Sequence, residues 1–274
     1  MLYEIFLRNK YLITFTYIVL AFEESLISMI PYFLGLAVDS ILVKDLNNFY
    51  IYLVVCSTAV TVAIIRKLWD TRLYSRIWSR IAKEKIDGLI EKKVERPKIV
   101  SRIHMLSEYT RFYENAIPDT LTAVIDIVIS FGILIYFVPL ASLIIAILTL
   151  LSIAVHYKQS LLYQDYTNKI QLANEKMNDD IINIDNPALE QNLDEIAKNL
   201  VKFSDVDSYV YGIHEFFATT AEIVLIFSLI NHEVSTGLIM ANVTYVFKIF
   251  MHVNSIGRSL MHFKVIKAYD NLLH

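Results

Sequence analysis

The chain has 274 residues and a net charge of −3 at pH 7, so it has no excess of positive charge with which to bind nucleic acid. Hydrophobic residues make up 55% of the sequence and charged residues only 19%, and the mean hydropathy is +0.47. These values exclude an ordinary soluble domain with a solvated surface. The 6 glycines and 5 prolines are few, which favours long helices. The composition therefore predicts an all-α membrane protein, with residues 1–274 forming a single transmembrane domain.

Six apolar stretches are long enough to cross a bilayer. A hydrocarbon core about 30 Å thick requires about 20 helical residues, because each residue adds about 1.5 Å. The fourth stretch is short but can extend at both ends, and Pro139 separates it from the third. The predicted transmembrane helices cover residues 11–36, 48–65, 117–138, 140–155, 211–230 and 236–256.

The two long connections, residues 66–116 and 157–210, have the pattern of helices rather than of loops. In the second connection, apolar residues recur at spacings of three and four on both sides of Asp185-Asn186-Pro187. Asp or Asn can cap a new helix there, with Pro in its first turn. About 25 residues out and 25 back predict a helical hairpin that reaches roughly 35–40 Å beyond the membrane.

The positive charges predict the orientation of the chain. Nearly all of the 25 Lys and Arg residues lie before the first span, in the two long connections or after the sixth span. Only Lys44 lies on the other side, and Lys248 lies inside the sixth span. By the positive-inside rule, both termini and both hairpins are cytoplasmic. The predicted location is the inner or plasma membrane, with multiple spans.

This arrangement resembles the transmembrane domain of ABC exporters, which has six spans and two cytoplasmic helical hairpins. The stretch from Pro31 through Gly35 to Asp39 is similar to the end of that family's first span. The stretch from Ser235 to Tyr245 is similar to the start of its sixth span. The resemblance covers essentially the whole chain. It implies two bundles paired around a central pathway, and a homodimer is the economical form of that pairing, with a heterodimer left open.

The chain also departs from the family pattern. Its glycines never have the spacing of a phosphate-binding GxxxxGK[ST] loop, so the sequence contains no ATP-binding domain. Family members commonly carry a glycine at the turn of the first hairpin, where this chain has Arg96-Pro97. Whether the hairpin tips bind a separate ATP-binding subunit is therefore open.

Ionisable residues inside the spans are the main functional candidates, because each costs about 2.5–3.5 kcal/mol at the centre of a bilayer. Asp119 and Glu215 lie near the predicted cytoplasmic ends of their spans and are weaker candidates, as are the aromatic Tyr245 and His252, which is four residues after Lys248. The residues expected to line the transport pathway or relay protons are Glu23, Glu24, Asp126, Glu222 and Lys248.

Structural ion pairing is the alternative role for these residues, for example Lys248 with Glu222 or with Asp126. The seven His residues and the single Cys show no metal-site spacing, and no catalytic motif is present. The sequence thus predicts no cofactor, no metal and no enzymatic activity.

The sequence favours an alternating-access transporter for a small molecule or peptide, driven by an ion gradient. Two observations favour this hypothesis, namely the missing nucleotide motif and the several carboxylates deep in the spans. Two alternatives remain. One is the transmembrane half of an ABC transporter with a separate ATP-binding subunit, and the other is a non-transporting membrane scaffold or sensor.

Overall fold

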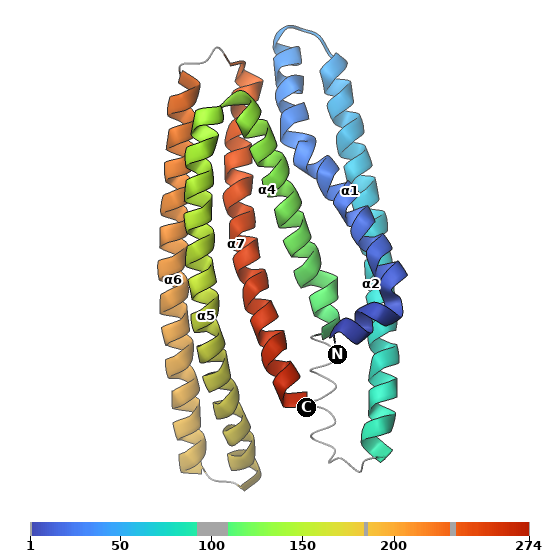
Figure 1. The fold of residues 1–274 in the computed structure, drawn as a ribbon, viewed down its shortest axis with the longest axis vertical. Coiled ribbons are helices and arrows are strands. Elements are labelled where there is room, and N and C mark those ends of the chain that lie inside the picture. The colour runs from blue at the N-terminus through green and yellow to red at the C-terminus, as the bar shows by residue number, and fades with distance from the viewer. Residues whose placement is uncertain (1, 92–108, 184–185, 231–233, 274) are drawn as a thin grey trace.

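Figure 1 shows a computed structural model of the chain, which describes residues 2–91, 109–183, 186–230 and 234–273. These residues form helices almost throughout and include no strand. The expected departure at Arg96-Pro97 lies outside the described residues. The helices are α1 (Leu2–Leu42), α2 (Asn47–Glu91), the π-helical turn η1 (Phe112–Ala116), α4 (Ile117–Phe137), α5 (Pro139–Asn183), α6 (Asn186–Ile230) and α7 (Thr236–Leu273).

Six helices of the described chain are long and apolar enough to cross a membrane, which confirms the predicted fold class. Each contains a stretch that is long and apolar enough to be a span. In α2 other helices cover little of this stretch, and in α7 they cover half of it. The apolar side chains that remain exposed are those that a bilayer would cover. The spans lie within Ile5–Leu42, Asn47–Ile86, Tyr109–Phe137, Pro139–Tyr163, Leu189–Ile230 and Thr236–Lys264.

The helices form two long antiparallel pairs with two helices between them. Helix α1 packs along α2 and α5 along α6, while α4 and α7 lie between these pairs (Figure 1). Helices α5 and α6 have 45 residues each, so each is about 68 Å long, roughly twice the thickness of a bilayer core. The end of α6 and the start of α7 lie at the same end of the molecule as the short connections α1–α2 and α4–α5, as the alternating connection lengths predict (Figure 1).

Two prolines have different effects on the helices. Val138 has φ −140° and ψ 64°, a non-helical conformation that ends α4, and Pro139 begins α5 immediately afterwards. Pro31 lies inside α1, where it cannot donate the backbone hydrogen bond to residue 27. The chain therefore turns sharply between α4 and α5 but continues through Pro31.

Two apolar clusters hold the described bundle together. One joins α4, α5, α6 and α7, and it includes Leu134, Ile145, Leu225 and Ile249. The other joins α1 and α2 to the start of the third span through Ile13, Tyr74 and Tyr113, among others. Helices α1, α4 and α7 all pack against one another, and several buried polar side chains lie where they meet.

Candidate functional site

Asp126 is the centre of a buried polar cluster formed by three helices. Its carboxylate accepts a 2.7 Å hydrogen bond from the ammonium of Lys248 on α7 and is also paired with His252, one turn further along the same helix. The hydroxyl of Ser28 on α1 donates a third bond to it. Asp126 is 2% exposed, and its side chain joins α4 to both neighbours. We call Ser28, Asp126, Lys248 and His252 the Asp126 centre.

The electrostatics of this centre favour a charged carboxylate. A buried ion pair is tolerated in a low-dielectric interior only when further hydrogen bonds satisfy its charges. Asp126 accepts hydrogen bonds from Ser28 of α1 and Lys248 of α7 and is within ion-pair distance of His252. Lys248 and His252 share one face of α7 at positions i and i+4, as the sequence predicts, and both meet the same carboxylate. Of the two partners proposed for Lys248, the structure has Asp126.

Tyr245 is inserted into the backbone of α1 next to Pro31. In a regular helix the N–H of Tyr32 donates to the C=O of Ser28. Here the hydroxyl of Tyr245 donates to the C=O of Ser28 at 3.1 Å and accepts the N–H of Tyr32 at 3.2 Å. Tyr245 is fully buried, so this hydroxyl satisfies two backbone groups that no water reaches. Side-chain insertion of this kind is a physical cause of helix bending.

The two glutamates in the middle of α1 have different surroundings. Glu23 is paired with Arg66 of α2, and Arg66 also donates a 2.7 Å bond to Asp70. Glu24 is 8% exposed and lies near the hydroxyl of Thr122 on α4. Adjacent helix positions point about 100° apart, so the two carboxylates face different neighbours, as expected. Glu24 therefore extends the Asp126 centre, whereas Glu23 belongs to an ion-paired group between α1 and α2.

A close crossing of α1 and α7 lies at the end of the bundle that carries the short connections. A Cβ atom added to Gly35 would lie 2.5 Å from the carbonyl oxygen of Gly237, so the two backbones touch. Asp39 accepts bonds from the N–H of Gly237 at 2.8 Å and from the hydroxyl of Ser235 at 2.5 Å. Asp39 thus caps the first turn of α7 from a different helix. The two stretches that resemble ABC exporters are in direct contact here.

The remaining candidates are not brought into the Asp126 centre. Asp119 and Glu215 are exposed near the ends of their spans. Glu222 is half-buried on α6, and the described residues provide no ion-pair partner for it. The candidates therefore divide into a central group, an ion-paired group around Arg66 and a separate carboxylate on α6.

Some members of the site were missed by sequence reasoning. Ser28 and Thr122 are ordinary small polar residues, and nothing in their spacing marks them as partners of carboxylates. Arg66 is the first basic residue after the second predicted span, so the charge pattern places it in the cytoplasmic connection and gives no sign that it pairs with Glu23. The position of Glu23 inside an apolar stretch was the one available signal, because a buried carboxylate calls for a cation.

The fold and this centre define a multi-pass membrane protein in which ionised side chains connect the helices within the apolar region. The family model described as the ABC transporter transmembrane region matches residues 2–237. The chain therefore belongs to this family and is a membrane transporter component. No curated protein matched the chain.

Proposed function

We propose that the chain forms one half of an alternating-access transporter for a small molecule or peptide, and that an ATP-binding domain drives it. The family membership supports this, because ABC transmembrane regions generally work with ATP-binding partners. That domain would belong to a partner polypeptide or to another part of the same protein. The proposed orientation has both hairpins in the cytoplasm, where ATP is available.

The Asp126 centre is the observation that carries the proposal. Ionised groups inside a bilayer are costly and mark pathways or moving elements. This centre joins α1, α4 and α7 through one carboxylate, so these helices cannot separate there without breaking or exchanging charge-assisted bonds. In alternating access, we expect such a centre to hold one conformation until the energy of ATP hydrolysis displaces it.

A second copy of the chain would complete the pathway in this proposal. A closed two-fold dimer is the commonest oligomeric solution, and half-transporters of this topology pair around an axis. Native mass spectrometry of the protein in mild detergent tests the stoichiometry. A stable monomer in the membrane, shown by the absence of cross-linking between copies, would contradict the homodimer.

A proton-coupled mechanism is the second candidate, and it rests on two carboxylates. Glu24 is buried near the neutral hydroxyl of Thr122, and Glu222 is half-buried without an ion pair in the described part of the chain. Such groups can bind and release protons as their surroundings change. This candidate predicts that Glu24→Gln and Glu222→Gln remove substrate-dependent proton movement in proteoliposomes.

The deciding experiment is purification of the full protein from its native membrane, followed by reconstitution. We expect a stoichiometric ATP-binding domain and substrate-stimulated ATP hydrolysis. Asp126→Asn is expected to uncouple ATP hydrolysis from transport, whereas the matched control Asp119→Asn, an exposed carboxylate on the same helix, is expected to retain coupling. A dimer without an ATP-binding domain that transports only with a proton gradient would contradict the ATP-driven transporter and support the proton-coupled one. A protein that transports nothing under either condition would favour the membrane scaffold or sensor.

A further inference from the structure

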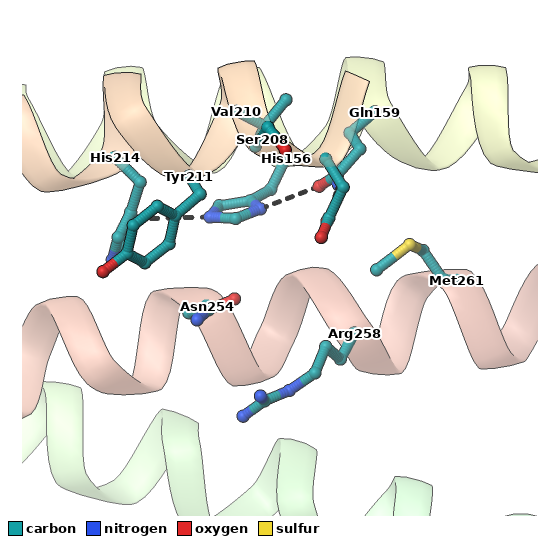
Figure 2. A pocket seen from close by; sticks show the side chains of 10 residues that line it. His156, Gln159, Ser208, Val210, Tyr211, His214, Asn254, Arg258 and Met261 are labelled. Carbon is teal, nitrogen blue, oxygen red and sulfur yellow. Dashed lines mark hydrogen bonds between the residues drawn. The ribbon is translucent and has the colours of Figure 1, made fainter. Parts of the chain in front are cut away.

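A polar cavity of about 410 Å³ lies between α5, α6 and α7 and includes no residue of the Asp126 centre. Figure 2 shows side chains of α5 and α6 on one side of this cavity and Asn254, Arg258 and Met261 of α7 on the other. Asp207 of α6 also lines it, so the cavity has one anionic and one cationic side chain on different helices. The proposed transport mechanism uses neither of these two charges.

Neither charged side chain of the cavity has an ion-pair partner in the described part of the chain. Arg258 donates a long bond of 3.3 Å to the hydroxyl of Ser255, three residues earlier on its own helix. Asp207 accepts a 2.7 Å bond from the neutral amide of Gln159. Both Arg258 and Asp207 are exposed. A ligand that carries both charges can therefore bind each of them without first breaking a salt bridge.

A chain of buried hydrogen bonds holds the carboxylate of Asp207 in place. The amide nitrogen of Gln159 donates to Asp207, so its oxygen accepts the proton on Nδ1 of His156 at 3.2 Å. The ring of His156 is bonded in turn to Nδ1 of His214 at 3.4 Å, and the hydroxyl of Ser152 lies 2.8 Å from the same nitrogen. Gln159 and both histidines are buried. Asp207 is thus positioned from the interior, and a positioned acceptor loses little freedom when a ligand binds.

The cavity lies at the predicted level of the lipid headgroups. Asp207 comes shortly before the fifth predicted span, which begins at residue 211, and Arg258 follows the sixth, which ends at residue 256. Tyr211 lines the cavity and is 59% exposed, at a depth where Tyr is enriched in membrane proteins. A lipid headgroup can therefore enter the cavity while its acyl chains stay in the bilayer.

We propose that this cavity binds the headgroup of an aminophospholipid of the phosphatidylethanolamine class. The guanidinium of Arg258 suits the phosphate, because its N–H donors match the spacing of two phosphate oxygens. The carboxylate of Asp207 suits the ammonium, which has three N–H donors. A choline headgroup has methyl groups in place of these donors, and a glycerol headgroup has no cation for Asp207. The volume lies within the range of about 300–1,000 Å³ that is usual for small-molecule sites.

Native mass spectrometry of the full protein, delipidated in detergent, tests the headgroup preference. The probes are phosphatidylethanolamine, phosphatidylcholine and phosphatidylglycerol with the same acyl chains. We expect phosphatidylethanolamine to bind about 10-fold more tightly than the other two, because it alone offers a charged hydrogen-bond donor to Asp207. Equal affinities for the three lipids would overturn the proposal. Displacement of the bound lipid by free phosphoethanolamine would assign the cavity to a soluble zwitterion and overturn the choice of a lipid.

Two substitutions separate the roles of the two charges. Asp207→Asn is expected to weaken the binding of phosphatidylethanolamine about 10-fold without weakening that of phosphatidylglycerol. Arg258→Gln is expected to weaken the binding of both lipids, because both carry the phosphate. Both residues are exposed, so we expect the variants to fold, and size-exclusion chromatography checks this.

The matched controls are Asp205→Asn on α6 and Lys158→Gln on α5. Both residues are exposed near the same predicted membrane boundary, and neither lines the cavity. These controls are expected to leave all lipid affinities unchanged. Equal effects of Asp207→Asn and Asp205→Asn, or of Arg258→Gln and Lys158→Gln, would show a general attraction of lipids to surface charge and would overturn the proposed site.

Discussion

At the scale of single residues, Asp126 is a buried carboxylate whose charge is balanced by the buried ammonium of Lys248. Its side chain is 3% exposed, and that of its partner Lys248 is 12% exposed. Removing one member of a buried ion pair leaves the other charge without compensation, whereas removing both members can be nearly neutral. This asymmetry distinguishes a true pair from two residues that happen to be near each other.

Asp126→Asn is expected to lower the free energy of unfolding by about 3–5 kcal/mol, because Lys248 keeps its charge without an anionic partner. The measurement is resistance to unfolding by SDS in mixed micelles. The double variant Asp126→Asn with Lys248→Met is expected to recover most of the loss. Strictly additive effects of the two substitutions would show that the side chains are not coupled.

Tyr245→Phe is expected to change the backbone of α1 rather than only its packing. The variant removes the hydroxyl that bonds both Ser28 and Tyr32, and an unpaired buried backbone group costs about 1–3 kcal/mol. The direct bond between these two groups can then form, which straightens the helix near Pro31. Spin-label distances between the two ends of α1 measure this change. An unaltered distance, together with unaltered stability, would contradict the role assigned to the hydroxyl.

At the scale of helices, the crossing of α1 and α7 depends on two glycines, whereas Gly132 and Gly212 have no such role. Gly35 and Gly237 allow the backbones to touch, but a Cβ at Gly132 of α4 would meet nothing within 4 Å. Small residues allow this close packing between membrane helices, where apolar burial gives little driving force.

Gly237→Ala is expected to separate α1 from α7, because the added Cβ collides with the backbone of Gly35 and the side chain of Asp39. We expect lower stability in SDS unfolding. The control Gly132→Ala is expected to leave stability unchanged or to raise it by up to about 1 kcal/mol, since alanine is the better helix former. Equal effects of the two substitutions would contradict a backbone contact at this crossing.

The sequence predicted the helices better than the contacts between them. Apolar stretch lengths located all six spans, and Pro139 marked the boundary between α4 and α5, because these signals are local. The contact of Tyr245 with α1 depends on how two distant helices are rotated about their axes, which periodicity does not determine. Lys248 had two candidate partners for the same reason. Predicting the pairing of Glu23 with Arg66 requires knowing how deep each residue lies in the membrane. The charge pattern places Glu23 inside the first span and Arg66 outside the second, in the cytoplasmic connection.

At the scale of the whole molecule, the orientation in the membrane stays a prediction that labelling can test. The single Cys56 is first replaced by Ser, and one cysteine is then introduced at Val43 or at Glu190, which lie at opposite ends of the molecule and are exposed. An impermeant thiol reagent is expected to label Val43→Cys on intact cells and Glu190→Cys only after permeabilisation. The reverse pattern would show that both hairpins face outward and would remove the proposed access to ATP.

The long pair α5–α6 has a mechanical consequence that follows from its length alone. Each helix is about 68 Å long, so a tilt of about 5° about one end moves the other end by about 6 Å. Helix α7 packs against both helices of this pair and also against α1 and α4, so it lies where such a lever would act on the Asp126 centre. A push at the far end of this pair would thus reach α7 as a smaller displacement, and we expect that displacement to exchange hydrogen-bond partners at the ion pair.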